Sequence, residues 1–169
     1  PDISFSNCGM PYFVGGTITN RNDLLLETPE SLKGRYDLDV RVRHLATNVD
    51  PKAKKVSVKN LDSGETFDLD YDYLVLSPGA DPIRPPIPGA DGPNVCTLRD
   101  MGDMDRIASV ASKSRTACVV GAGFIGLEMA ENMVHRDLEV SIVEMFDQVF
   151  PAMDWEMTQP LANELKAHG

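Results

Sequence analysis

Residues 116–144 read TACVVGAGFIGLEMAENMVHRDLEVSIVE, and this segment sets the predicted architecture. The apolar run at 117–120 is typical of a buried parallel strand, and it leads directly into glycines spaced as GxGxxG. Apolar residues at helical spacing follow, and a second apolar run at 140–143 ends at Glu144. We therefore predict an α/β fold in which strand, glycine turn, helix and parallel strand follow one another.

Each glycine of this turn has its own predicted role. Gly121 allows the tight turn out of the strand, Gly123 leaves room for a pyrophosphate, and Gly126 lets the helix approach the sheet. Phe124 and Ile125 open the helix, whose unpaired N–H groups can hold phosphate oxygens. We assign these five residues to a dinucleotide site. The alternative is a helix that needs close packing and binds no ligand.

Glu144 stands at the end of the second strand, roughly 20 residues beyond the glycines, where an acid accepts hydrogen bonds from ribose hydroxyls. Its carboxylate would repel a 2′-phosphate, and no arginine occurs at 145–147. We therefore assign Glu144 to the same site and predict NADH as the cofactor in preference to NADPH.

The 169 residues are 42% hydrophobic and 25% charged, with a net charge of −10. This acidity argues against partners such as nucleic acid or anionic membranes, and no apolar run is long enough to span a bilayer. No signal peptide is evident, and we predict no metal site. Cys8, Cys96 and Cys118 form no close pair, which favours a reducing, cytoplasmic setting. Cys96 and Cys118 are predicted to lie in the core.

Cys8 is surrounded by residues that predict the start of a helix. Ser4, Ser6 and Asn7 are residue types that cap helix N-termini, and Pro11 is acceptable only in a first turn. We therefore predict Cys8 at or just before a helix N-terminus, which favours the reactive thiolate form. The alternative is a buried structural cysteine, the usual fate of a free thiol.

Other segments predict helices, an antiparallel meander and short apolar strands. Helices are expected at 22–26, 29–32 with Thr28 as cap, 101–111 with Asp100 as cap, and 154–168 with Asp154 as cap. Strands are expected at 39–50, 55–59, 66–69, 73–76 and 95–98. In the last helix we expect Pro160 to cause a kink, and Met157, Leu161 and Leu165 to face the core. Asp137 is predicted to end the helix of the glycine turn in a left-handed conformation, which aspartate tolerates.

The fold predicted from these elements is incomplete. A mononucleotide-binding half needs three parallel strands, and the segment before the glycine turn has no glycine-rich phosphate turn of its own. We therefore expect a piece of a longer polypeptide, inactive by itself and with unpaired sheet edges.

Several short segments together resemble one family, over essentially the whole chain. They are SFSNCGMPY at 4–12, TPESL at 28–32, LSPGA at 76–80, GAGFIGLE at 121–128 and QVFP at 148–151. The chain resembles the single-cysteine branch of the FAD-dependent pyridine nucleotide–disulfide oxidoreductases, which includes coenzyme A-disulfide reductases and NADH-dependent persulfide reductases. The resemblance implies an FAD/NAD(P)-linked reductase fold with Rossmann-like ββα layers. Residues 1–113 would be a partial FAD-binding domain, residues 114–169 the first part of an NAD-binding domain, and the full-length protein a homodimer.

The same resemblance implies electron transfer from NADH through FAD to Cys8, which would reduce a coenzyme A disulfide, a coenzyme A persulfide or a polysulfide. Ser4 and Asn7 match substrate-contacting positions. Phe124 matches an aromatic residue that covers the flavin until the nicotinamide displaces it.

Ser77 and Gly79 match a segment near FAD, for which the alternative is a simple tight turn. Asn7 favours the reductases, whereas Met10 favours the oxidases. The rival functions are therefore an NADH oxidase or peroxidase that uses a cysteine sulfenic acid, and a nucleotide-binding module without turnover.

Overall fold

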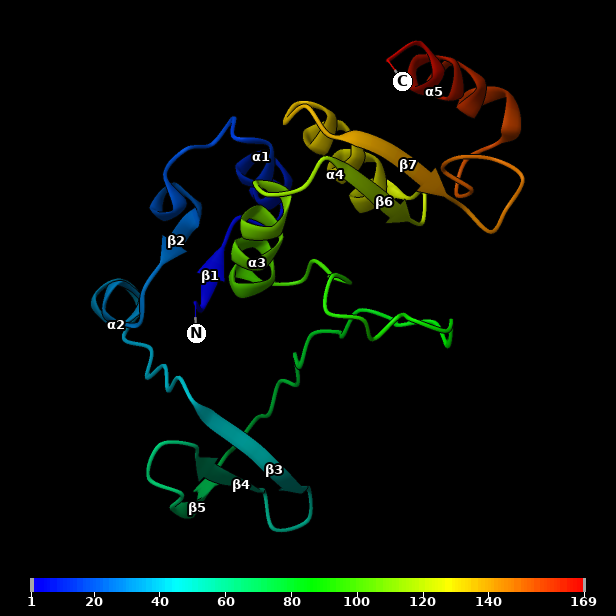
Figure 1. Ribbon diagram of the computed structural model, residues 1–169. Coiled ribbons are helices and arrows are strands. Elements are labelled where there is room, and N and C mark those ends of the chain that lie inside the picture. Colours follow the sequence, from blue (N-terminus) through cyan, green and yellow to red (C-terminus); the bar gives the residue numbers. More distant parts are fainter. Residues whose placement is uncertain (1, 169) are drawn as a thin grey trace. The chain divides into compact units, whose positions relative to one another are not determined.

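The computed structural model describes residues 2–168 (Figure 1). Its contacts divide the chain into two compact units. Unit 1 contains the residues up to Ser4 and Glu27–Asp81, and unit 2 contains Phe5–Leu26 and Pro82–Gly169. This division is one of packing. The predicted boundary between an FAD-binding and an NAD-binding part near residue 113 stays a prediction.

Unit 1 is built from helix α2 (Pro29–Tyr36) and strands β3 (His44–Asp50), β4 (Lys55–Asn60) and β5 (Thr66–Asp70). The strands form an antiparallel sheet in the order β3-β4-β5, which confirms the predicted meander, although the first strand begins at His44 and not at residue 39. Thr28 caps α2 as predicted: its side chain accepts the N–H of Ser31, and the Ser31 hydroxyl accepts the N–H of Thr28. Because this capping box satisfies two N–H groups at the helix start, α2 begins at Pro29.

The predicted strand at 73–76 is wrong. These residues have no regular structure, and the exposed fractions of Tyr73, Val75 and Leu76 are 95%, 84% and 70%. An extended apolar run becomes a strand only when a neighbour completes its hydrogen bonds, and no segment within residues 2–168 pairs with this one.

Unit 2 holds most of the helices, which Figure 1 shows beside the parallel strands. In chain order, its elements are β1 (Ser4–Phe5, beginning in unit 1), the 3₁₀ helix η1 (Asn7–Gly9), α1 (Met10–Gly15), the 3₁₀ helix η2 (Arg21–Leu24), β2 (Leu25–Glu27, ending in unit 1), α3 (Met101–Ala111), β6 (Thr116–Val120), α4 (Phe124–Val134), β7 (Glu139–Val143) and α5 (Trp155–His168). Strand β1 pairs with β2, and β6 runs parallel to β7 with Thr116 opposite Glu139. The strand, turn, helix and parallel strand predicted at 116–144 are therefore confirmed.

Of two short predictions in this unit, one is half right and one is wrong. The helical piece expected at 22–26 is the 3₁₀ helix η2 as far as Leu24, after which strand β2 begins, and the strand expected at 95–98 has no regular structure. Helix α3 agrees with its prediction in full: it spans Met101–Ala111, and the Asp100 side chain accepts the N–H of Asp103 at 2.9 Å.

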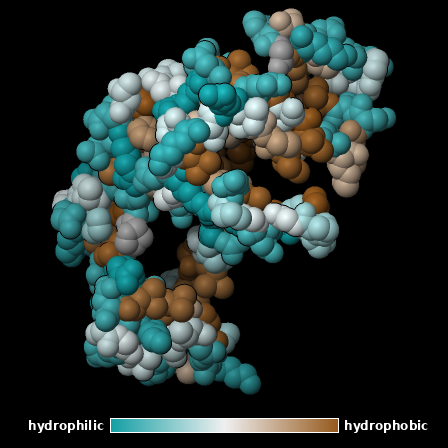
Figure 2. Space-filling model, in the orientation of Figure 1, coloured by the Kyte–Doolittle hydropathy of each residue, from teal (hydrophilic) through white to brown (hydrophobic). Residues whose placement is uncertain are grey.

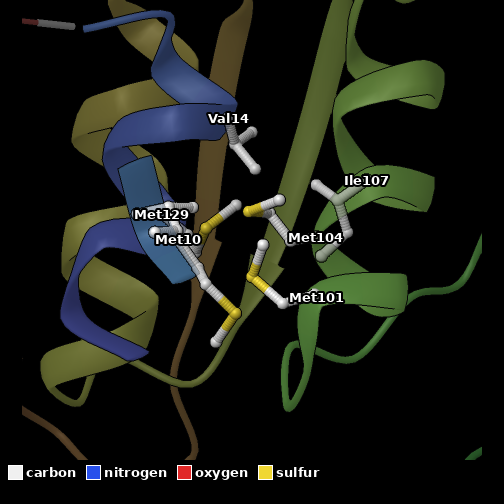
Figure 3. Packing of buried hydrophobic residues seen from close by; sticks show 7 residues of the cluster. Met10, Val14, Met101, Met104, Ile107 and Met129 are labelled. Atoms are coloured by element: carbon white, nitrogen blue, oxygen red, sulfur yellow. The ribbon is translucent and has the colours of Figure 1, made fainter. Parts of the chain in front are cut away.

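The core of unit 2 is rich in methionine and joins three helices (Figure 3). Its buried members are Met10 and Val14 from α1, Leu24 from η2, Met101, Met104 and Ile107 from α3, and Met129 from α4. Burial of each such side chain stabilises the fold by about 1.5–3 kcal/mol. Cys96 packs against this cluster, in agreement with its predicted core position.

Cys118 contradicts its prediction, because it is exposed. Along β6 and β7, alternate residues are half-buried toward α4, whereas Cys118, Val120 and Val143 belong to the alternate set that is exposed. Apolar surface over this part of unit 2 is visible in Figure 2. Within residues 2–168, β6 and β7 pair only with each other, so both outer edges of this sheet are unpaired, as predicted.

Helix α5 also differs from its prediction. It runs from Trp155 to His168 with Pro160 inside it, so the helix does not restart there, and the expected kink stays a prediction. Met157, predicted to face the core, is 64% exposed, whereas Leu161 and Leu165 are half-buried. The buried residue of its first turn is Thr158, whose hydroxyl donates to the carbonyl of Trp155 at 2.8 Å.

The end of α4 has the predicted left-handed residue, Asp137, with φ of 61°. The N–H of Leu138 donates to the carbonyl of Met133, and the N–H of Asp137 donates to that of Val134. This pair of bonds is a Schellman motif, in which glycine is the usual left-handed residue.

We therefore expect Asp137→Gly to raise the free energy of unfolding by about 0.5–1 kcal/mol, because glycine adopts this conformation without steric cost. Urea unfolding of the variant and the parent protein measures the difference. Glu131→Gly, in the exposed middle of the same helix, is the matched control and should lower stability by about 1 kcal/mol. A destabilised Asp137→Gly variant would contradict the assignment of this cap.

Candidate functional site

The glycine turn between β6 and α4 has the geometry that a pyrophosphate requires. Gly121 has φ of +102°, a conformation that other residues rarely adopt. A Cβ on Gly126 would lie 1.9 Å from the carbonyl oxygen of Gly121, so this position accepts only glycine. A Cβ on Gly123 would meet no atom within 4 Å, so the space beside the turn is open. Gly121 and Gly126 thus have the turn conformation and the close helix approach predicted for them, and the open space at Gly123 fits a bound pyrophosphate, whose binding there stays a prediction.

Glu144 is attached to this turn by hydrogen bonds. Its Oε2 accepts the N–H of Ala122 at 2.7 Å, and its Oε1 accepts the N–H groups of Met145 at 2.7 Å and Phe146 at 3.1 Å. Three backbone hydrogen bonds lower the pKa of Glu144 below its ordinary value. The bond from Ala122 has the largest effect, followed by the bonds from Phe146 and Met145. The carboxylate is therefore held in its charged form beside the turn, where it repels a further negative group.

The lowered pKa of Glu144 predicts a pH dependence of stability. Above the unfolded-state pKa of roughly 4.3, the charged carboxylate stabilises the fold, and this contribution is lost as the pH falls through the lower folded-state value. We expect Glu144→Gln to be less stable than the parent at pH 6, with a difference that shrinks as the pH falls below about 4.3 and through the lower folded-state pKa.

Urea unfolding across this pH range measures that difference. Asp147→Asn is the control, since Asp147 is an exposed carboxylate with no hydrogen bond or ion pair within residues 2–168. A stability difference for Glu144→Gln that stayed constant with pH would contradict the role of the charge.

Cys8 lies where the sequence predicts it, at the start of a helical segment. Helix η1 (Asn7–Gly9) runs directly into α1 with Pro11 in its first turn, and Cys8 is exposed rather than buried. Ser6 stands at the N-cap position of η1, although its side chain makes no capping hydrogen bond. Within residues 2–168, Cys8 is therefore exposed and is not a buried structural cysteine.

The neighbours of Cys8 in sequence fix its backbone. A Cβ on Gly9 would lie 2.4 Å from a methyl group of Leu24, so η1 packs closely on the core at this point. Met10 is only 4% exposed and fills the methionine cluster. Because the Met10 side chain is buried in the core, it is not exposed beside Cys8. The presence of Met10 therefore does little to distinguish an oxidase from a reductase.

The helix that follows Cys8 packs directly on the helix of the glycine turn. At the end of α1, a Cβ on Gly15 would lie 2.2 Å from Oδ1 of Asn132 in α4. Asn132 is 1% exposed, and its Nδ2 donates to the carbonyl of Glu128 at 2.8 Å. The helical segment that contains Cys8 and the helix that follows the glycine turn thus pack against each other. The sequence did not predict this contact.

Phe124 and Ile125 begin α4 and are exposed, whereas the other four predicted site residues are not part of the glycine turn. Ser4 is half-buried in β1, and Asn7 is exposed in η1. Ser77 and Gly79 belong to unit 1, in an exposed segment without regular structure, where Gly79 has φ of +74°. No turn is formed at residues 77–80, so the tight turn considered as the alternative for these two residues is not observed. Their assignment to FAD stays a prediction.

The sequence missed two residues of the site, Ala122 and Phe150. Ala122 is fully buried; its N–H donates to Glu144 and its carbonyl accepts the N–H of Phe150 at 2.8 Å. The QVFP segment at 148–151 was the available signal, but nothing in it shows which residue reaches the turn.

No helix within residues 2–168 is long and apolar enough to cross a membrane.

Comparison with known proteins shows the family of this chain. The family described as pyridine nucleotide-disulphide oxidoreductase matches residues 2–169. A coenzyme A disulfide reductase of Staphylococcus haemolyticus is 38% identical over 97% of this chain and 37% of its own length. An NADH oxidase of Methanocaldococcus jannaschii is 36% identical over 99% of this chain and 38% of its own length. The chain thus spans less than half of these relatives.

Two solved structures are also similar to nearly the whole of this chain, which again spans less than half of each of them. The crystal structure of reduced Bacillus anthracis CoADR-RHD superposes with a TM-score of 0.94 and 44% identity over 98% of this chain and 30% of that chain. The structure of an NAD-dependent persulfide reductase from A. fulgidus gives a TM-score of 0.92 and 37% identity over 98% of this chain and 31% of that chain.

Proposed function

The chain belongs to the pyridine nucleotide-disulphide oxidoreductase family, and from this premise we propose that it acts in an NADH-dependent flavoprotein that reduces a coenzyme A disulfide, a coenzyme A persulfide or a polysulfide through Cys8. The observation that carries the proposal is the exposed Cys8 at the start of a helical segment whose continuation, α1, packs on the helix of the glycine turn. Relatives named coenzyme A disulfide reductase and persulfide reductase support this substrate class.

In this proposal the glycine turn binds NADH. The N–H groups at the start of α4, including those of Phe124 and Ile125, hold the pyrophosphate, and Gly123 leaves the space for it. Glu144 accepts hydrogen bonds from the adenosine ribose and disfavours a 2′-phosphate, which makes NADH the preferred nucleotide. A bound flavin, when present, supplies the two-electron relay between the nicotinamide and sulfur.

Cys8 carries the sulfur chemistry. Its thiolate attacks one sulfur of the substrate disulfide, a new S–S bond to Cys8 forms, the substrate S–S bond breaks, and one thiolate leaves. Two electrons and a proton are then needed to release the second thiol and restore Cys8. Ser4 and Asn7, close to Cys8 in sequence, are proposed to contact the substrate. We further propose that the full-length protein is a cytoplasmic homodimer.

A second candidate function is an NADH oxidase or peroxidase, favoured by the relative of that name in M. jannaschii. Here Cys8 would alternate between thiolate and sulfenic acid, with a peroxide as oxidant. Both candidates use the same residues, so the position of Cys8 does not separate them.

A substrate comparison tests the proposal. The full-length protein is supplied with NADH and, in turn, with coenzyme A disulfide, coenzyme A persulfide, oxygen and hydrogen peroxide, and NADH consumption is measured. We expect the sulfur substrates to be turned over fastest, and NADH to be used in preference to NADPH. Rapid consumption of oxygen or peroxide with no response to either coenzyme A substrate would instead establish the oxidase or peroxidase.

A further inference from the structure

The two exposed residues Asn7 and Cys8 stand at the tip of a closed turn. The N–H of Gly9 donates to the carbonyl of Ser6 at 3.1 Å, and this hydrogen bond closes the turn around them. Gly9 is buried and Ser6 is half-buried, so the two ends of the turn are held by the fold while its tip reaches solvent. The contacts of Ser6 and Gly9 therefore determine where the Cys8 sulfur stands.

Leu24 contacts both ends of this turn. Its carbonyl accepts the N–H of Ser6 at 2.8 Å. One methyl group of its side chain lies 2.4 Å from the point that a Cβ on Gly9 would occupy, which is closer than real Cβ atoms approach their neighbours. The turn that carries Cys8 thus rests on Leu24 through one hydrogen bond and one close apolar contact.

Leu24 is itself fixed from two sides. Its side chain is 1% exposed and belongs to the methionine-rich core of unit 2. It is also the last residue of η2, whose start is capped by Asn20, because the Asn20 side chain accepts the N–H of Asn22 at 3.1 Å. Arg21 of the same short helix forms an ion pair with Asp105 of α3 at 3.0 Å. The support under the turn is therefore attached to the rest of unit 2.

We propose that Leu24 is a positioning residue for Cys8, which it holds in place through Ser6 and Gly9 without touching the substrate. The inference rests on the proposed function, because it takes Cys8 as the sulfur that attacks the substrate. The rate of that attack depends on where the thiolate stands, and a misplacement of about 1 Å can cost a rate up to about 10²-fold. Reduction of the flavin by NADH does not use the Cys8 sulfur, so it should not depend on Leu24.

The test compares Leu24→Val with Ile107→Val in the full-length protein carrying flavin. Each substitution removes one carbon atom from the same core cluster, so both should lower stability in urea unfolding by a similar amount. With coenzyme A disulfide as substrate, we expect kcat to fall roughly three- to tenfold in Leu24→Val and less than about twofold in Ile107→Val. The KM for the disulfide should stay within about twofold of the parent in both variants. Anaerobic stopped-flow reduction of the flavin by NADH should proceed at the parent rate in both.

Gly9→Ala tests the same contact from the side of the turn. Its methyl group would meet the Leu24 side chain and displace the turn, so kcat should fall about tenfold. Adding Leu24→Val withdraws the methyl group that Gly9→Ala meets, and the double variant should recover to within about threefold of the parent kcat. If Gly9→Ala alone does not fold, the comparison of Leu24→Val with Ile107→Val still decides the question.

Two results would overturn the inference while leaving the proposed function intact. One is an equal kcat for Leu24→Val and Ile107→Val at an equal loss of stability, which would show that Leu24 has a purely structural role. The other is a folded double variant that is no faster than Gly9→Ala alone. If the parent protein turned over neither coenzyme A disulfide nor coenzyme A persulfide, the proposed function itself would fail and the inference with it, which is a distinguishable result.

Discussion

Replacing Cys8 by serine is expected to lower the rate of coenzyme A disulfide or persulfide reduction by about 10³-fold or more, because the reaction loses its covalent nucleophile. A serine hydroxyl does not ionise near neutral pH and cannot form an S–S bond with the substrate. The residue is exposed, and its neighbour Gly9 anchors the backbone against Leu24, so the substitution should leave the local fold intact. The loss should therefore be chemical rather than structural.

Two measurements separate these causes. Anaerobic stopped-flow reduction of the flavin by NADH should proceed at the parent rate in Cys8→Ser, because the nucleotide turn is unchanged. Cys118→Ser is the matched control, since Cys118 is also an exposed free cysteine of unit 2, and its turnover should stay within about twofold of the parent. Parent-like turnover in Cys8→Ser would remove Cys8 from the mechanism.

The features predicted correctly from the sequence are those that short-range physics determines. The N-caps Thr28 and Asp100 and the left-handed Asp137 depend on hydrogen bonds to residues only a few positions away. The meander depends on alternating side chains and on a turn at 62–65. The position of Cys8 at the start of a helical segment likewise followed from the residues that flank it.

The failed predictions concern burial and pairing over longer distances. An apolar run at 73–76 and an apolar strand around Cys118 have the right residues for a core, but no segment within residues 2–168 covers them. Met157 fails for the same reason. Periodicity says which face of an element is apolar, whereas burial requires a partner surface that periodicity does not specify.

In the site, too, short-range features were predicted from the sequence and long-range contacts were not. The left-handed Gly121 and the close approach at Gly126 agree with the sequence prediction, because the spacing GxGxxG implies them, whereas a pyrophosphate at Gly123 stays a prediction. The contacts of Ala122 with Glu144 and Phe150, and of Gly15 with Asn132, join residues far apart in sequence and could not be predicted from one chain. A bulky residue such as Phe150 also gives no sign in the sequence that its backbone is left-handed.

Substitutions in the glycine turn are expected to have large effects of two different kinds, one on stability and one on NAD⁺ binding. Gly126→Ala is expected to lower the free energy of unfolding by about 3 kcal/mol, since its Cβ would lie 1.9 Å from the carbonyl oxygen of Gly121 and backbone must move. Gly123→Ala places its Cβ in open space, so stability should change by less than about 1 kcal/mol. The cost of Gly123→Ala should instead appear in NAD⁺ binding, because the methyl group occupies the space assigned to the pyrophosphate.

Urea unfolding and calorimetric titration of NAD⁺, applied to both variants, distinguish the two roles. Gly34→Ala is the control for adding a methyl group at an open helical position, and it should stabilise the protein by about 0.5–1 kcal/mol. A stable Gly126→Ala variant would mean that α4 can move away from the turn, contrary to the close approach seen here. A Gly123→Ala variant that bound NAD⁺ like the parent would show that the open space beside the turn is not where the phosphates bind, and the nucleotide assignment would then lose its geometric basis.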